Sequence, residues 1–166
     1  MKMNLLVKDN HIYINGTKYD CAVGKNGITN KKSEGDMSTP VGEYRFNHIY
    51  YRSDRIKRLS FLLSSSEIFP EDGWCDDPKS KYYNQHIKFP FKDKAEALYR
   101  DDNLYDIICV LNYNTSPIIK GKGSAIFLHS AKRNFEGTEG CIAIDRKLLM
   151  KVSENISDQS IISIEI

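Results

Sequence analysis

The sequence predicts a mainly β domain, a sandwich or barrel with a few short helices packed at its edge. Short segments rich in Val, Ile and Tyr partly alternate between apolar and polar residues, and turn residues separate them. An amphipathic helical pattern stands near the C-terminus. Strands and helices do not alternate regularly along the chain, which disfavours a doubly wound parallel sheet.

The first quarter of the chain is expected to form three strands, at 3–9, 11–15 and 17–23. Turn residues separate them: Asp9 with Asn10, and Asn15 with Gly16. Residues 24–42, GKNGITNKKSEGDMSTPVG, then hold four glycines and one proline and are predicted to be a long loop. Because loops of this length are uncommon inside a compact domain, they are often functional.

The rest of the chain continues this pattern. Further strands are expected at 43–52, 105–113, 124–129 and 160–166. Residues 53–92 have no clear periodicity and are predicted to be irregular. DKAEALYR, residues 93–100, is predicted to be a short helix that Asp93 opens. In residues 145–156, Asp145 is the expected N-cap, and Leu148, Leu149 and Val152 form one apolar face.

Composition places the protein among ordinary globular domains. Its 166 residues fit a single domain, 1–166, and 40% of them are hydrophobic. The formal net charge of +2, from 24 basic and 22 acidic residues, does not favour a nucleic acid partner. No apolar segment approaches the ~20 residues of a membrane span, and the N-terminus lacks the apolar core of a signal peptide. Nothing in the sequence indicates an oligomeric state.

The four cysteines are widely spaced and form no C-x-x-C pair, which argues against a zinc knuckle or a disulfide framework. Cys21 and Cys109 lie in strand patterns and are expected to be buried thiols. Cys75 stands between Trp74 and an aspartate and is a weaker candidate nucleophile, because no histidine lies near it in the sequence. Cys141 differs, because TEGCIAI places it where a polar loop meets an apolar run.

A nucleophilic role for Cys141 requires a base within hydrogen-bond reach, since the thiolate is the attacking species. His129 ends an apolar run twelve residues earlier, and the intervening loop is long enough to fold back. Lys132 and Arg133 in that loop would add positive potential. Amides around Gly140 could point at a developing oxyanion. The arrangement fits a Cys–His nucleophile, but a packing thiol and an unrelated strand-end histidine remain an alternative.

The other histidines are weaker candidates. His11 is expected in the first hairpin, His48 in a strand and His86 in a loop, and none is tied to a glycine-flanked cysteine.

The turn WCDDP, residues 74–78, has two interpretations. An exposed Trp74 beside Asp76 and Asp77 would suit recognition of an amine-bearing or sugar-containing ligand. Alternatively, Trp74 plugs the core and an aspartate caps the turn. Adjacent carboxylates in one turn rarely have the geometry that glycoside hydrolysis needs.

These residues resemble the L,D-transpeptidase catalytic domain, also called the YkuD domain. Its signature is a histidine, a loop and Ser/Thr-x-Gly-Cys, matched here by His129 and 138–141. Residues 24–46 resemble its Lys-x-Glu-Gly-Asp-x-x-Thr-Pro-x-Gly segment. Further matching segments follow in the same order, and the resemblance covers about 24–155: GWCDDPKSKYYN, Tyr99 to Asp101, YDIICVLNYN and GKGSAIFLH.

The resemblance implies a YkuD-like β fold with the cysteine at the mouth of a cleft. Cys141 would attack a stem tetrapeptide of peptidoglycan and form a thioester. His129 would act as base, the Ser130 carbonyl would orient its ring, and Gly140 would contribute to the oxyanion hole. No metal or cofactor is implied, and the implied location is the periplasm or cell envelope. Expected substrate contacts are Trp74, Asp76, Asn84, Arg100, Arg133, Thr138 and Glu139.

The sequence departs from the commoner family pattern near the thiol. Glu139 stands where many members have a second histidine, and Ala143 stands where many have an arginine. The loop between His129 and Cys141 is also shorter than in many members. Glu139 would disfavour a thiolate unless it points away or pairs with Lys132 or Arg133. Arg133 or Arg100 is the expected substitute for the missing arginine.

Three functions remain open at this point. The thioester could pass to an amine, which makes the protein an L,D-transpeptidase. It could pass to water, which makes the protein an L,D-carboxypeptidase or an amidase. A cell-wall binding module that keeps the cleft without the chemistry is the third.

Overall fold

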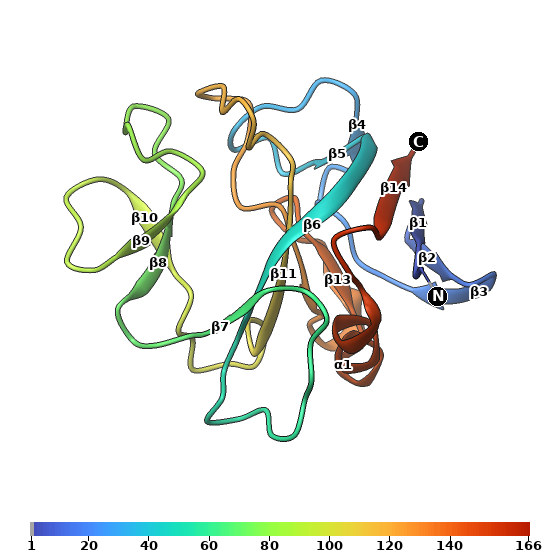
Figure 1. Ribbon diagram of the computed structural model, residues 1–166. Coiled ribbons are helices and arrows are strands. Elements are labelled where there is room, and N and C mark those ends of the chain that lie inside the picture. Colours follow the sequence, from blue (N-terminus) through green and yellow to red (C-terminus); the bar gives the residue numbers. More distant parts are fainter. Residues whose placement is uncertain (1) are drawn as a thin grey trace.

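The computed structural model describes residues 2–166, and strands dominate it (Figure 1). Within these residues the largest sheet has nine strands, so the predicted fold class, mainly β, is confirmed. Its strands are β1 (Leu5–Lys8), β2 (His11–Ile14), β3 (Thr17–Asp20), β6 (Gly42–Tyr51), β7 (Ser65–Glu67), β11 (Ile107–Leu111), β12 (Phe127–Ser130), β13 (Ile142–Ile144) and β14 (Ile161–Glu165).

The nine-stranded sheet curls into a nearly closed barrel. Its order is β13-β12-β11-β6-β14-β1-β2-β3, with β7 beside β6. The two ends of this order are joined just beyond β3. Ala22 N–H donates to Ala143 O at 2.8 Å, and Ala143 N–H donates to Ala22 O at 2.9 Å. This bridge lies outside β3, and it covers the edge of β13 at Ala143.

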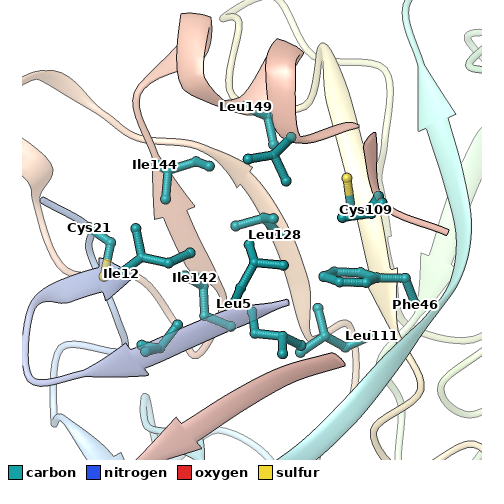
Figure 2. Close-up of a cluster of buried hydrophobic side chains, with 14 of the residues drawn as sticks. Leu5, Ile12, Cys21, Phe46, Cys109, Leu111, Leu128, Ile142, Ile144 and Leu149 are labelled. Carbon is teal, nitrogen blue, oxygen red and sulfur yellow. The ribbon is translucent and has the colours of Figure 1, made fainter. Parts of the chain in front are cut away.

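The strands β11, β12 and β13 present alternate residues to two faces, as the period of two in a strand requires. We call the first the core face. It carries the side chains of Cys109, Leu111, Leu128, Ile142 and Ile144, which are buried in the main cluster (Figure 2).

The opposite side of the same strands is called here the cavity face. It carries Ile108, Val110, Phe127 and Cys141, which belong to a second buried cluster. Trp74 covers this cluster, with its ring edge-on to Phe127 at 5.1 Å between centroids.

The predicted C-terminal helix is confirmed as α1 (Arg146–Asn155). The carboxylate of Asp145 accepts from the backbone N–H groups of Lys147 and Leu148, which fills the predicted N-cap role. Leu149 and Val152 are buried against the core face. The helix follows β13 directly and anchors that strand beside the barrel (Figure 1).

A separate three-stranded sheet lies to the left of the barrel in Figure 1. Its strands are β8 (Asp72–Cys75), β9 (His86–Lys88) and β10 (Ala95–Ala97), in the order β10-β8-β9. The prediction of a helix at 93–100 is therefore wrong. Its central residues pair with β8, where Ala95 lies opposite Cys75 and Glu96 lies opposite Trp74.

Two other local predictions need correction. His86 begins strand β9 and does not lie in a loop, and residues 53–92 contain three strands where none was expected. The glycine-rich segment 24–42 is mostly loop, but β4 (Ile28–Thr29) and β5 (Thr39–Pro40) pair in parallel within it. A short 3₁₀ turn, η1, spans Arg133–Phe135. No helix in residues 2–166 is long and apolar enough to cross a membrane.

Candidate active site

A cavity of about 300 Å³ opens on the cavity face, and both Cys141 and His129 line it. The glycine-rich segment, the small sheet, β12 and the loop before β13 all contribute to its wall. Its remaining lining residues are Lys25, Glu34, Asp76, Glu96, Arg100, Leu104, Tyr105, Ser124, Ala125, Ile126, Lys132, Glu136, Gly137, Thr138, Glu139, Gly140 and Ala143.

Strand register explains why the thiol and the imidazole meet at one cavity. Strands β12 and β13 are parallel neighbours, with His129 beside Ala143 and Leu128 beside Ile142. Leu128 and Ile142 point to the core face, so the residues that alternate with them point to the cavity. Cys141 and His129 therefore project from adjacent strands on the same side of the sheet.

The Cys141 side chain is nearly enclosed, with 9% of its surface exposed. Its Sγ–H donates to Ala125 O at 3.0 Å, and Phe127 N–H donates to the sulfur at 3.4 Å. Burial is the main cause that raises the pKa of the Cys141 thiol to about 12, and the carboxylates of Glu96 and Glu139 act in the same direction. The resting sulfur is therefore a thiol whose proton points at a backbone carbonyl.

His129 is buried with a defined tautomer. Its Nδ1 lies 2.8 Å from the Ser130 carbonyl oxygen. Since a carbonyl oxygen only accepts, Nδ1 carries the proton in the neutral ring, and Nε2 has the free lone pair. Burial lowers the pKa of His129 to about 4, against the opposing effect of the bond to Ser130. The ring of Tyr105 packs edge-on against the imidazole at 5.3 Å between centroids.

The two shifts together describe a neutral pair. A thiol stays protonated below its pKa of about 12, and an imidazole stays unprotonated above its pKa of about 4. At neutral pH the site therefore holds a thiol and a free imidazole, not a thiolate and an imidazolium.

Carboxylates are unusually numerous beside this pair. Burial is the main cause that raises the pKa of Glu96 to about 7, although its Oε1 accepts from the Tyr105 hydroxyl at 3.1 Å. Burial also raises the pKa of Asp76, whose Oδ1 is buried without a hydrogen-bond partner in residues 2–166. Glu139 forms no ion pair with Lys132 or Arg133 within residues 2–166, and Lys132 Nζ lies 3.9 Å from Glu136 Oε2.

Arg100 lies in the cavity wall, where a substitute for the missing arginine was expected. Its guanidinium is held by two bonds to the Asp102 carboxylate, at 2.8 and 2.7 Å. Arg133, the other expected substitute, belongs to η1 and does not line the cavity.

Trp74 and Asn84 form the support of the cavity and do not line it. Trp74 is 6% exposed, so the alternative in which it plugs the core is correct. Its Nε1–H donates to Asn84 Oδ1 at 3.0 Å, and Ala125 N–H donates to the same oxygen at 3.0 Å. Ala125 has a φ of +55°, a left-handed conformation that costs a non-glycine residue free energy. The Asn84 amide thus fixes Ala125, whose carbonyl accepts the hydrogen bond from the Cys141 thiol.

Gly140 and Thr138 shape the turn that presents Cys141. Gly140 has a φ of +143°, and a β-carbon there would lie 2.9 Å from Ser38 O. Its N–H donates to Thr138 Oγ1 at 3.0 Å, and the same hydroxyl donates to Cys141 O at 2.7 Å. Thr39 Oγ1 donates to Gly140 O at 2.8 Å from the glycine-rich segment. The N–H of Gly140 is therefore engaged within the turn.

Sequence reasoning missed three residues that shape the site. Ala125 and Tyr105 carry no recognisable signal, because their roles depend on a backbone conformation and on a ring contact. Glu96 was hidden inside the pattern assigned to a helix. Among residues 2–166, no group of three or more His, Cys, Asp or Glu side chains is placed to hold a metal ion.

Comparison with known proteins identifies the family. The model of the L,D-transpeptidase catalytic domain, YkuD, matches residues 2–164. The chain therefore belongs to this family of L,D-transpeptidase-type enzymes, as the motifs predicted, and the match extends beyond 24–155. No curated protein sequence matches the chain.

Among solved structures, that of Bdellovibrio bacteriovorus Bd1075 is similar, with a TM-score of 0.51 and 16% identity. The similarity covers 99% of this chain and 48% of that chain. This chain thus spans about half the length of that structure, and at this identity the likeness concerns the fold alone.

Proposed function

We propose that the protein is a cysteine acyltransferase that acts on the stem tetrapeptides of peptidoglycan through a thioester. The observation that carries the proposal is the shared orientation of Cys141 and His129 in one cavity, with Nε2 of the neutral imidazole free to accept a proton. Membership of the family supplies the substrate class. The corresponding place of work is the cell envelope, where peptidoglycan lies.

The first half of the reaction forms the acyl-enzyme. The Cys141 proton moves to Nε2 of His129 as the sulfur attacks the carbonyl carbon that precedes the terminal D-alanine. The carbon–nitrogen bond then breaks, and the imidazolium returns the proton to the leaving amine. The Ser130 carbonyl keeps the ring in the tautomer that these two transfers require.

The second half releases the acyl group. An amine of another stem attacks the thioester carbonyl, its proton passes through His129 to the sulfur, and a new amide bond forms. A second hollow, lined by His11, Asp20, Asn134 and Phe135 among others, shares Lys25 and Gly137 with the first cavity. The adjacent hollow favours an amine acceptor, because a second chain could lie there beside the first cavity. Water as the acceptor would make the protein a carboxypeptidase or amidase instead.

The test is incubation of the purified protein with tetrapeptide muropeptides, followed by mass analysis. Crosslinked dimers are expected from the wild type, and Cys141→Ala should give none. Cys109→Ala removes a thiol from the core face and is the matched control, which should retain activity. Trimmed tripeptides without dimers would assign hydrolysis. Binding without turnover in the wild type would assign a binding module and refute the catalytic proposal.

A carbapenem provides an independent check, because its strained lactam is an acyl donor that needs no second substrate. Intact mass should show one adduct on the wild type and none on Cys141→Ala. An unmodified wild type would contradict an accessible nucleophile.

A further inference from the structure

The glycine-rich segment contributes a buried lysine to the structure behind the cavity. The Lys32 side chain is only 6% exposed. Its Nζ donates to Asp36 Oδ1 at 2.5 Å and to Ser33 O at 3.1 Å. Since burying an ammonium is costly, such a group is retained only where its charge is balanced or used.

The position of this ammonium is set by two glycines that frame the nucleophile. A β-carbon on Gly140 would lie 3.6 Å from Lys32 Nζ, and one on Gly123 would lie 3.0 Å from Lys32 Cε. Gly140 directly precedes Cys141. Gly123 stands two residues before Ala125, whose carbonyl accepts the hydrogen bond from the thiol. The lysine therefore fills the space between the two backbone segments that hold the sulfur.

Asp36 keeps the ammonium in place. Its carboxylate also accepts from the backbone N–H groups of Ser33 and Ser38, so the carboxylate is itself rigidly held. Ser38 O lies close to Gly140 as well. The charge thus has a fixed place relative to the turn that presents Cys141.

The positive charge of Lys32 affects the pKa of the Cys141 thiol. Beyond burial, Glu96 and Glu139 raise the pKa of Cys141, whereas the Phe127 N–H and Lys32 lower it. Of the two cations that the sequence indicated, Lys132 lines the cavity and lowers the pKa of His129, whereas Arg133 lies outside the cavity lining. The ammonium that acts on the sulfur comes from 109 positions earlier in the chain, as the numbers of Lys32 and Cys141 show.

We propose that Lys32 is a positioning residue of the active site: its buried ammonium, fixed behind Gly140, stabilises negative charge on the Cys141 sulfur and on the oxyanion that forms beside it. This inference rests on the proposed function for its catalytic meaning. Other titratable groups line the same cavity: Glu96 on β10, Tyr105 before β11, His129 on β12, Glu139 in the turn, and Lys25, Glu34, Asp76, Arg100, Lys132 and Glu136.

Alkylation of Cys141 tests the inference without any substrate. The sulfur forms a bond to the reagent carbon, iodide leaves and the thiol proton goes to solvent. Iodoacetamide is neutral and iodoacetate is an anion of nearly the same size. The rate with iodoacetamide reports the thiolate fraction, and the ratio of the two rates reports the local potential. Peptide mass mapping assigns the modification to Cys141.

Lys32→Met keeps the length of the stem and removes the charge. The iodoacetamide rate at pH 8 should fall about tenfold, which corresponds to a change of about one unit in the thiol pKa. The ratio of iodoacetate to iodoacetamide rates should fall a further threefold or so, because the anion loses its attraction. Lys31→Met removes a neighbouring exposed charge and should change neither quantity by more than about twofold.

Two outcomes would overturn the inference. In one, Lys32→Met leaves both rates unchanged. In the other, it lowers both rates by the same factor at every pH and leaves the thiol pKa given by the pH profile unchanged, which indicates a structural role without an electrostatic one. If Lys32→Met fails to fold, Lys32→Gln replaces it, and circular dichroism checks the fold of each variant.

The outcome is independent of the acyl-transfer proposal. If the wild type does not process muropeptides but Lys32→Met still changes the rate ratio, the proposed function fails and the role of Lys32 on the sulfur stands. If muropeptides are processed and the ratio does not change, the reverse holds.

Discussion

Two thiols on the same group of strands, Cys109 and Cys141, show how position decides chemistry in this protein. Both are free and buried, and burial raises the pKa of each. Cys109 lies on the core face, 0% exposed, among aliphatic side chains (Figure 2). Cys141 lies on the cavity face, where the apolar cluster meets His129 and several carboxylates.

The two thiols differ in the face of the sheet to which they point, and not in residue type. Successive side chains along each strand alternate between the apolar core and the charged cavity, and the register of each strand decides which face a given residue meets. Acyl-transfer chemistry needs a nucleophile that is dry enough to be reactive and close enough to polar groups to exchange a proton. Cys141, at the margin of the second cluster and beside the cavity that His129 lines, fits both requirements. The predictions below test that contrast.

The largest expected effect is the contrast itself. Under native conditions Cys141 should be alkylated by iodoacetamide at least about 10³-fold faster than Cys109, because Cys109 reacts only when the fold opens. Peptide mapping over time measures both rates in one sample. Similar rates would show that the cavity gives the Cys141 sulfur no access that the core lacks.

Removing the base should have the next largest effect. His129→Asn preserves a donor to the Ser130 carbonyl but has no basic nitrogen, so turnover of a tetrapeptide should fall about 10²-fold or more. His48→Asn changes a histidine whose ring nitrogens meet the hydroxyls of Ser64 and Ser66, and it should leave turnover unchanged. Equal losses in the two variants would remove His129 from the mechanism.

The turn before the nucleophile can be tested with a single methyl group. Gly140→Ala places a β-carbon against Ser38 O in a left-handed conformation, and should lower the free energy of unfolding by about 2 kcal/mol. Carbapenem acylation should slow about tenfold, since Cys141 must shift. Gly16→Ala, at a φ of +81° in open space, should cost about 1 kcal/mol and leave acylation unchanged. Chemical denaturation and intact mass measure the two effects.

The smallest effect concerns the acidic side of the cavity. The pKa of Glu96 is raised to about 7 by burial, so its ionisation between pH 6 and 8 adds a negative charge that faces the sulfur. Wild-type alkylation should therefore rise by less than tenfold per pH unit in this range. Glu96→Gln keeps an acceptor for Tyr105, should restore the full tenfold slope and should react about threefold faster at pH 8.

Glu96→Gln should also change how the stability of the fold depends on pH. Glu96 holds its proton more tightly in the folded state than its ordinary pKa of 4.5 allows, so wild-type stability falls as pH rises from about 4.5 to about 7. Glu96→Gln should lack this component of the decline. Thermal unfolding of both proteins across that range measures the difference, and parallel curves would contradict the assignment.

Local patterns predicted those parts of the fold that local interactions decide. The apolar run in 105–113 and the cap at Asp145 were sufficient to locate β11 and α1, because a run of buried β-branched residues and an N-cap bond both act within a few residues. The segment 93–100 was assigned incorrectly because Ala and Glu favour helices in isolation, whereas pairing with β8 imposes a strand on Ala95–Ala97.

The same distinction between local and long-range interactions applies to the residues of the candidate site. The motif indicated Cys141 and His129, since the signature is short and contiguous. Lys32 and Ala125 could not be assigned a role, because one acts through a contact across the chain and the other through a backbone conformation. Trp74 and Asn84 stood in matching segments, and only the fold distinguishes a residue that lines a wall from one that supports it.

The closure of the barrel has a practical consequence for handling the protein. Ala143, two positions after the nucleophile, is joined by both its amide and its carbonyl to Ala22. The seam of the barrel thus runs through β13, the strand that directly follows Cys141. A fragment that begins at residue 24 keeps every motif residue but loses the partner of this seam. The first two hairpins therefore hold β13 in place, and removing them should destabilise this strand and the position of Cys141 that precedes it.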